Sequence, residues 1–126
     1  VSEAVITEAV TTAAEYGAAA PVVPVKDSIK RIEDGNIAAD VARNTLAAVQ
    51  TPQVFRADLL RRAYEAEYRP EFTDDASVVE QAGEAVFLCE GERTNLKITT
   101  PEDMVIAEAL LAGREKTEED TDGENL

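Results

Sequence analysis

The 126-residue sequence contains no histidine, no tryptophan and a single cysteine, Cys89. Without histidine, the chain can form neither a Cys/His zinc site nor a mechanism that needs a histidine base. One cysteine cannot form a disulfide within the chain. Basic residues are also scarce, with 12 against 26 acidic ones and a formal net charge of −14. Because nucleic acid requires a partner of the opposite sign, we expect no nucleic-acid partner.

Long apolar runs are absent as well, since none approaches the ~18–20 residues needed to span a bilayer. The first residues do not resemble a signal peptide. We therefore expect no membrane partner and a cytoplasmic location. The chain begins with Val1 rather than Met, as a piece of a longer protein would. The acidic, lysine-poor composition suggests adaptation to a high-salt cell, although the acidic C-terminal segment contributes to it.

At 126 residues the chain is long enough for one domain with one hydrophobic core. Helical spacing of apolar residues predicts a helix over residues 1–16, stopped at Gly17. Its predicted buried face comprises Ile6, Val10, Ala13 and Ala14. Residues 18–25 form a short valine-containing run, which predicts a buried strand ending near Pro24. A helix followed by a buried strand indicates a layered α/β fold.

Residues 26–48 predict a projecting arm. Two short runs, 28–32 and 37–41, flank the turn at residues 33–36, and Asp34-Gly35 is a typical hairpin turn. Neither run alternates cleanly, so neither has an obvious core of its own to pack on. A two-stranded hairpin is only marginally stable alone. We therefore expect this arm to pack on a partner subunit.

The turn at residues 49–55 divides the chain into a strand-like half and a helix-rich half. Pro52 fixes its own φ and keeps Thr51 out of the helical region, which predicts a rigid turn. A stiff loop that carries polar groups on an apolar anchor suits a ligand site. The alternative to a ligand site is that residues 49–55 only form the start of a helix.

The remaining residues predict helices separated by short strands. The first helix is expected at 58–67, with an apolar stripe of Leu59, Leu60, Ala63 and Tyr64. The second is expected at 74–82, capped by Thr73 and stopped by Gly83. The third is expected at 101–113, capped by Thr100 and stopped by Gly113, with a buried face of Met104, Ile106, Ala107, Leu110 and Leu111. Strands are expected at 85–89 and 96–98. Residues 114–126 are rich in acids and predict a disordered tail.

Five polar residues lie at predicted element ends, where α/β proteins place ligands. They are Ser28, Arg43, Thr51, Thr73 and Lys97. Two cations and three hydroxyls suit a phosphate monoester. Lys26, Lys30 and Arg31 lie in the same arm as Arg43, which favours an anion site despite the overall negative charge. Each residue also has a structural alternative. Ser28 would be a turn residue, Arg43 a solvated surface charge, Thr73 the cap of its helix and Lys97 an exposed strand lysine.

Four ordered motifs carry a family resemblance. They are Pro24-Val25-Lys26-Asp27-Ser28-Ile29-Lys30, Gln50-Thr51-Pro52-Gln53-Val54-Phe55, Thr73-Asp74-Asp75-Ala76-Ser77 and Asn95-Leu96-Lys97-Ile98-Thr99-Thr100-Pro101-Glu102-Asp103. From residue 18 to 111 the chain resembles the C-terminal half of the 2-C-methyl-D-erythritol 4-phosphate cytidylyltransferases of non-mevalonate isoprenoid biosynthesis. Ribitol-5-phosphate cytidylyltransferases share much of this pattern.

This resemblance implies part of a Rossmann-like nucleotidyltransferase fold, with residues 1–113 as the substrate-binding and dimerisation half. It implies transfer of CMP from CTP to the polyol phosphate, with release of pyrophosphate. In such a family, residues matching Thr51, Thr73 and Lys97 of one subunit hold the substrate. Those matching Ser28 and Arg43 reach over from the neighbour's hairpin arm, so a homodimer is implied.

Two departures from the family pattern limit this expectation. The glycine-rich nucleotide loop, its catalytic lysine and the Asp-containing motif that helps to hold Mg²⁺ have no match in this sequence. We therefore expect no catalytic residue and no metal ligand here, and no turnover by this chain alone. In the arm, Ala42 and Ala47 stand where the family tends to have aspartate and tryptophan. The alternative from another class is a non-catalytic dimerisation or interaction module that retains the fold.

Overall fold

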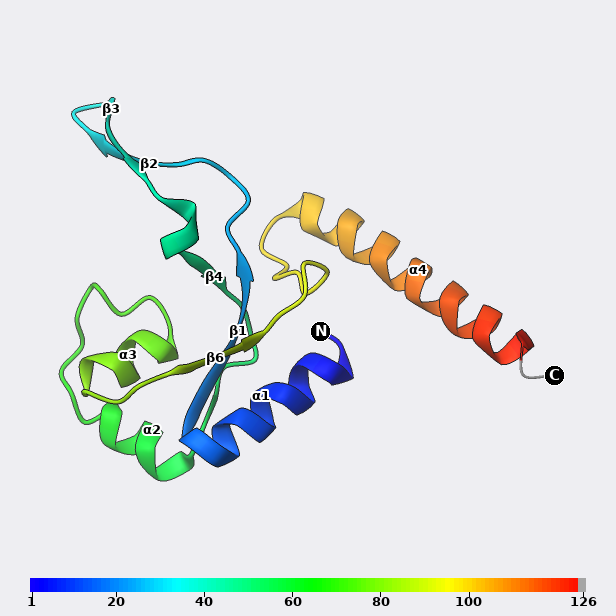
Figure 1. Ribbon diagram of the computed structural model, residues 1–126, viewed down its shortest axis with the longest axis horizontal. Coiled ribbons are helices and arrows are strands. Elements are labelled where there is room, and N and C mark those ends of the chain that lie inside the picture. The colour runs from blue at the N-terminus through cyan, green and yellow to red at the C-terminus, as the bar shows by residue number, and fades with distance from the viewer. Residues whose placement is uncertain (125–126) are drawn as a thin grey trace. The chain divides into compact units, whose positions relative to one another are not determined.

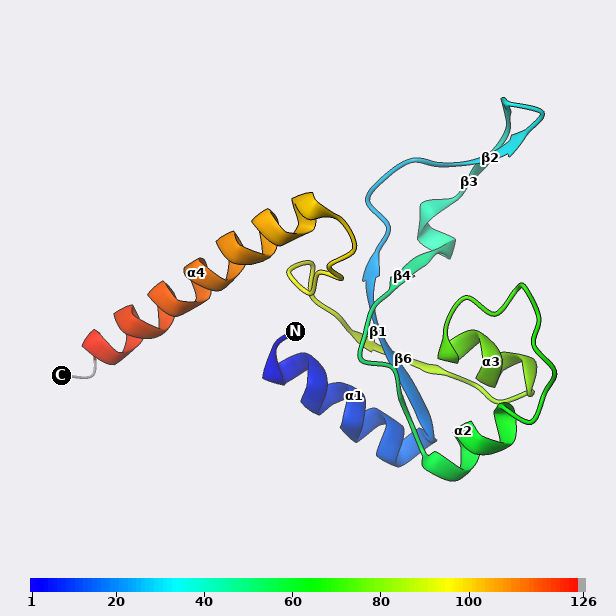
Figure 2. The ribbon, with the colours of Figure 1, turned by 180° about the vertical axis from the view of Figure 1, so that it is seen from behind.

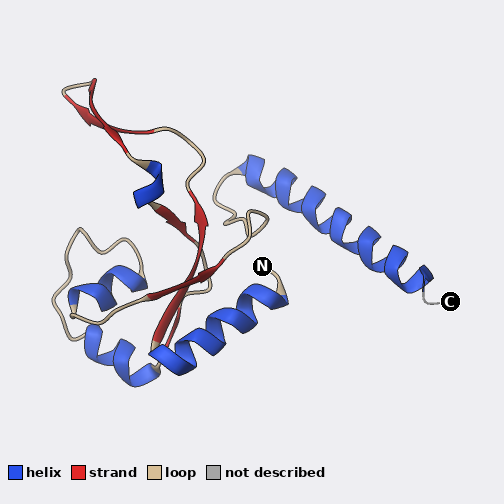
Figure 3. Cartoon of the chain, in the orientation of Figure 1, coloured by secondary structure: helices blue, strands red, loops and turns tan. Residues whose placement is uncertain are grey.

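The computed structural model describes residues 1–124. The chain divides into two units, Val1–Glu92 and the segment from Arg93 onward, and each is described by itself (Figure 1). Both α-helices and β-strands are present, which confirms the predicted mixed α/β class (Figure 3).

The first unit is built around the strand β1 (Ala18–Pro24), which confirms the strand predicted over residues 18–25. On one edge β1 pairs in parallel with β6 (Phe87–Glu90). On the other edge it pairs antiparallel with β4 (Ala47–Val49) and β5 (Val54–Phe55). The chain segment between β4 and β5 therefore leaves and rejoins the same edge of the sheet.

The helix α1 (Glu3–Tyr16) begins after Ser2, whose side chain accepts the Val5 N–H, and ends at Gly17 with φ 99°. The end of the helix agrees with the prediction, whereas its start lies two residues later than predicted. The predicted buried face is confirmed only at Ala13, because α1 buries Val5, Ala9 and Ala13, while Ile6 and Val10 are 40% and 50% exposed. The shift has a packing reason: alanines let the helix approach the sheet closely, and two of them, Ala9 and Ala13, form a buried cluster with Ala19 and Cys89.

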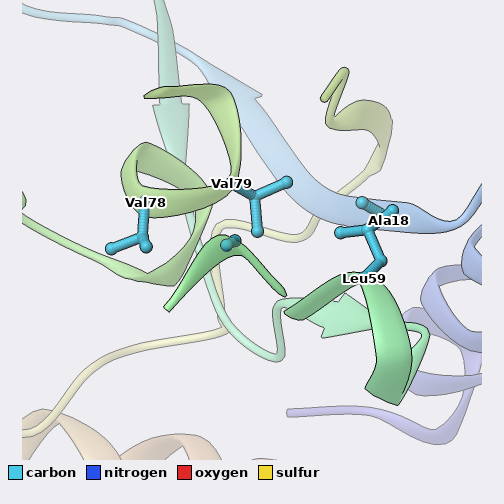
Figure 4. Close-up of a cluster of buried hydrophobic side chains, with 5 residues drawn as sticks. Ala18, Leu59, Val78 and Val79 are labelled. Atoms are coloured by element: carbon cyan, nitrogen blue, oxygen red, sulfur yellow. The ribbon is translucent and has the colours of Figure 1, made fainter. Parts of the chain in front are cut away.

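A second apolar cluster joins β1 to the helices α2 (Ala57–Ala63) and α3 (Asp75–Gln81). Its buried members are Ala18, Leu59, Ala63, Val78 and Val79 (Figure 4). The predicted helix over 58–67 is too long, since α2 stops at Ala63. Tyr64 caps it and is 54% exposed rather than part of the apolar stripe, and its hydroxyl hydrogen-bonds Asp75 instead.

The predicted hairpin is confirmed as a two-stranded sheet of its own, β2 (Ile29–Glu33) and β3 (Asn36–Val41). Its turn uses Asp34 and Gly35, both at positive φ. A short 3-10 helix, η1 (Arg43–Thr45), leads from β3 into β4. Both views show the hairpin extending from β1 and β4 on the side away from α2 (Figures 1 and 2).

The second unit consists of an irregular segment followed by α4 (Pro101–Glu124). The predicted strand at 96–98 is wrong, because that segment is irregular. The predicted helix start is confirmed: the Thr100 hydroxyl accepts the Asp103 N–H, and the Asp103 carboxylate accepts the Thr100 N–H. This reciprocal cap fixes the first turn.

The predicted stop at Gly113 is wrong, since α4 continues through it to Glu124. Residues 114–124, expected to be disordered, are helical, and residues 125–126 of that prediction lie outside the described residues. Glutamate, lysine and arginine are good helix formers, so an acidic composition does not by itself end a helix. The predicted buried face of this helix is not buried: Met104, Ile106 and Leu111 are each about half exposed. None of the helices in the described part of the chain combines the length and the apolar composition that a transmembrane span requires.

Candidate substrate site

The candidate site is centred on the loop of residues 50–53, which connects β4 to β5. Its Thr51–Pro52 peptide bond is cis. The Gln50 N–H donates to the Pro21 carbonyl at 2.8 Å, so the loop leaves β4 still attached to β1. The loop is thus held between strands and does not start a helix, which excludes the structural alternative for this turn.

The side-chain amide of Gln50 anchors the first end of the loop. Its Nε2 donates to the Glu92 carbonyl at 2.8 Å, and its Oε1 accepts the Glu92 N–H at 3.2 Å. Gly91, just before Glu92, donates its N–H to the Val22 carbonyl at 2.9 Å. A Cβ at position 91 would lie 2.9 Å from that same carbonyl oxygen and still closer to Gln50 Oε1. Position 91 must therefore be glycine for the amide to reach Glu92.

The side-chain amide of Gln53 anchors the other end. Its Nε2 donates to Asp74 Oδ2 at 3.1 Å, and its Oε1 accepts the Ala76 N–H at 3.0 Å. The loop is consequently joined both to the segment after β6 and to the start of α3. Thr51 lies between the two anchors, so the backbone on both sides of its hydroxyl is restrained.

The start of α3 corrects one prediction. Its N-cap is Asp74, not Thr73: Asp74 Oδ1 accepts the Ser77 N–H at 2.8 Å, and Ser77 Oγ accepts the Asp74 N–H at 3.2 Å. The Thr73 N–H also donates to Ser77 Oγ, at 3.1 Å. A charged carboxylate is the stronger acceptor, which explains why it displaces the neighbouring hydroxyl from the cap. The Thr73 side chain is therefore not committed to capping the helix.

Ser28 and Arg43 lie at the base of the hairpin. Arg43 Nη1 donates to the Lys26 carbonyl at 2.7 Å, which ties the two ends of the arm together. The cations of this arm are not equivalent, because Lys30 pairs with Asp40 and Arg31 with Glu33. Half of the predicted cationic group is thus neutralised within the hairpin itself.

Lys97 lies in the second unit, in the irregular segment before α4, and its side chain is exposed. Two residues later the Thr99 N–H donates to Asp103 Oδ2 at 3.0 Å. The hydrogen bonds from the Thr99 and Thr100 backbone lower the pKa of the Asp103 carboxyl. This carboxylate therefore fixes the backbone that follows Lys97.

The sequence pattern predicts a polar loop but does not identify the residues that hold it, which are Gln50, Gln53, Asp74 and Gly91. Their regular placement on either side of Thr51-Pro52 was the available indication. Cys89 has no role in this site, since it is buried in the α1 cluster, where burial raises the pKa of its thiol.

Known proteins resemble this chain over most of its length. The family model described as IspD: 2-C-methyl-D-erythritol 4-phosphate cytidylyltransferase matches residues 1–113. Proteins named 2-C-methyl-D-erythritol 4-phosphate cytidylyltransferase from Bacillus licheniformis and Rubrobacter xylanophilus are 48% and 52% identical over 115 and 111 residues, covering 90% and 85% of this chain. The crystal structure of the Thermus thermophilus protein of that name superimposes with a TM-score of 0.75 at 39% identity, over 89% of this chain and 56% of that one.

This chain spans about half the length of the curated relatives it matches, 50% and 48% for the two named above. The structural likeness places the sheet and helices described above in the nucleotidyltransferase architecture of the Thermus thermophilus structure.

Proposed function

Because this chain belongs to the 2-C-methyl-D-erythritol 4-phosphate cytidylyltransferase family, we propose that it provides the part of such an enzyme that binds the polyol phosphate. The reaction transfers CMP from CTP to 2-C-methyl-D-erythritol 4-phosphate and releases pyrophosphate, as a step of isoprenoid biosynthesis. The observation that carries this proposal is the family match over residues 1–113, which includes all five candidate site residues.

In this proposal Thr51, Thr73 and Lys97 bind one substrate molecule. The hydroxyls donate to the phosphate and polyol oxygens, and the lysine offsets phosphate charge. Two observations support it: the loop of Thr51 is restrained at both ends, and the Thr73 side chain is not committed to the cap of α3.

The chemistry that these residues serve is positional. A phosphate oxygen of the substrate forms a bond to the α-phosphorus of CTP, while the bond between that phosphorus and the pyrophosphate leaving group breaks. Holding the attacking oxygen in line supplies much of the rate enhancement in such reactions. We assign this chain the orientation of the polyol phosphate and expect it to catalyse no turnover by itself.

Magnesium is the cation that we expect the complete enzyme to use against the triphosphate charge. Among residues 1–124, no group of three or more acidic, cysteine or histidine side chains converges on one point. We assign none of the described residues to the ion, because the motif expected to hold it has no match in this sequence.

We further propose that the hairpin packs against a second copy of the chain, and that Ser28 and Arg43 act in the neighbour's site. Ile32 and Ile37 are cross-strand partners on one face of the hairpin and are 67% and 66% exposed. Apolar pairs so exposed on a two-stranded sheet favour burial by a partner. Sedimentation equilibrium tests this: Ile32→Glu should shift a dimer to monomer, and a wild-type monomer at every concentration would refute it.

Calorimetric titration with 2-C-methyl-D-erythritol 4-phosphate tests the substrate assignment, with ribitol 5-phosphate as the competing ligand. Lys97→Ala should raise Kd by about 10- to 150-fold, the equivalent of ~1.5–3 kcal/mol for a charged hydrogen bond. Lys116→Ala is the matched control, an exposed lysine of the same unit. Saturable binding of neither ligand would remove the proposal, whereas tighter binding of ribitol 5-phosphate would reassign the substrate.

A further inference from the structure

The half-buried side chain of Gln53 joins two polar positions of the candidate site that lie more than twenty residues apart in the sequence. Both ends of its amide are engaged at the start of α3, one as a donor to Asp74 and one as an acceptor from Ala76. An amide satisfied at both ends has a fixed orientation, because rotating it by half a turn would oppose like atoms. Gln53 therefore fixes the distance between its own loop and α3.

The same hydrogen bonds extend to Thr73. The Asp74 carboxylate that accepts from Gln53 also caps α3 through the Ser77 N–H. Ser77 Oγ in turn accepts the backbone N–H groups of Thr73 and Asp74. The path from Gln53 to the Thr73 backbone therefore consists of consecutive hydrogen bonds through Asp74 and Ser77. Thr51 is attached to this path through the two-residue connection to Gln53.

We propose that Gln53 is a positioning residue for the polyol-phosphate site, which holds the Thr51 hydroxyl in register with Thr73 without itself binding the ligand. This inference rests on the proposed function. It adds a role for a residue whose amide is already engaged by the protein and which therefore acts through Thr51. Asp74 serves the same arrangement as the acceptor that orients the amide.

A purely structural role would also weaken the protein when Gln53 is changed, so loss of stability cannot be the test. The distinguishing property is coupling. If Gln53 acts through Thr51, removing the Thr51 hydroxyl should abolish most of the effect of changing Gln53 on ligand binding. Two residues that act independently would show additive losses of binding free energy instead.

The experiment is calorimetric titration of 2-C-methyl-D-erythritol 4-phosphate into Gln53→Met, Thr51→Val and the double variant, each shown to be folded by circular dichroism. Methionine keeps the length of glutamine and removes both hydrogen-bonding groups. Gln53→Met should raise Kd about three- to tenfold, and the double variant should bind no more weakly than Thr51→Val within about twofold. The matched control is Gln81→Met at the other end of α3, where the amide accepts from Arg69, and it should leave Kd unchanged.

Gln53→Glu provides a second variant if the methionine variant does not fold. It keeps the acceptor for Ala76 and places a carboxylate beside Asp74, so the loop should be pushed away and Kd should rise at least as much. Wild-type affinity in folded Gln53→Met or Gln53→Glu, or additive losses in the double variant, would overturn the inference and leave the proposed function standing. If the wild-type chain binds no polyol phosphate, the proposed function fails, and the inference fails with it.

Discussion

Gly91→Ala is the substitution that probes the architecture of the loop most sharply. The added Cβ would lie 2.9 Å from the Val22 carbonyl oxygen, 3.1 Å from the Val22 carbonyl carbon and closer still to Gln50 Oε1. Real Cβ atoms do not come within 3.0 Å of another heavy atom, so the Gln50 amide must move and the backbone contact with Val22 must also give. The backbone is held by the Gly91 N–H bond to Val22, and we therefore expect the amide to be displaced first.

The magnitude follows from these contacts. Displacing the Gln50 amide sacrifices its two hydrogen bonds with Glu92, each worth about 1 kcal/mol net. Residual overpacking against the Val22 backbone adds about 1–3 kcal/mol. Gly91→Ala should therefore lower the free energy of unfolding by about 3–5 kcal/mol. Because the loop before Thr51 is then released, the variant should also bind the polyol phosphate more weakly.

Urea unfolding followed by circular dichroism measures the first effect, and calorimetric titration of the folded variant measures the second. Gly113→Ala is the control, because nothing lies within 4 Å of its added Cβ and alanine is the better helix former. It should leave stability unchanged or raise it slightly. A Gly91→Ala protein as stable as the wild type would show that Gln50 does not hold the loop in the way described.

Three further outcomes follow from the described contacts. Val79 is 0% exposed, so Val79→Ala leaves a cavity and should lower the free energy of unfolding by about 2 kcal/mol. Val105 is 67% exposed, so the control Val105→Ala should change the free energy of unfolding by less than about 0.5 kcal/mol. Equal effects of the two substitutions would contradict the described core. The Asp103 carboxyl should titrate below 3.8 by carbon-detected NMR, because the capping hydrogen bonds depress its folded-state pKa. Its stabilisation of α4 is then complete above about pH 4 and is lost as the pH falls through that lower pKa. A titration midpoint at or above 3.8 would contradict the capping contacts. If the charge of −14 reflects a high-salt cell, the unfolding midpoint should rise across a potassium chloride series, and an unchanged midpoint would discard that hypothesis.

Local rules predicted the parts of the fold that local chemistry decides. Gly17 and Gly83 stop helices at positive φ, the Asp34-Gly35 turn closes the hairpin, and Thr100 with Asp103 starts α4, all as their residue types require. In each case the residues that interact are within a few positions of one another, so the local sequence pattern is sufficient to predict the turn or the helix end.

Prediction was weaker where tertiary contacts decide between local alternatives. Helical spacing predicts Ile6 and Val10 on the buried face of α1, but close packing on β1 buries Val5, Ala9 and Ala13 and leaves those two residues exposed. At the start of α3, Thr73 and Asp74 are both good caps, and only the structure shows the carboxylate engaged by Gln53 as well as by the helix. Pairings such as Gln50 with Glu92 span 42 positions, and no local pattern announces them.

The candidate site likewise has one part that the sequence predicts and one part that it does not. The residue types and the four motifs indicated a phosphate-binding set, and the resemblance they carry agrees with the family match over residues 1–113. The motifs did not indicate which side chains hold the loop, because an anchoring glutamine and a ligand-binding glutamine look alike in a sequence. The hydrogen bonds of Gln50 and Gln53 separate these two roles.

Backbone amide NMR during titration with 2-C-methyl-D-erythritol 4-phosphate tests the central claim most directly. We predict saturable shifts, with one common Kd, at the amides of Thr51, Thr73 and Lys97, and none at the Lys116 amide far along α4. Absence of any saturable shift, or saturable shifts confined to residues away from these three, would contradict the account.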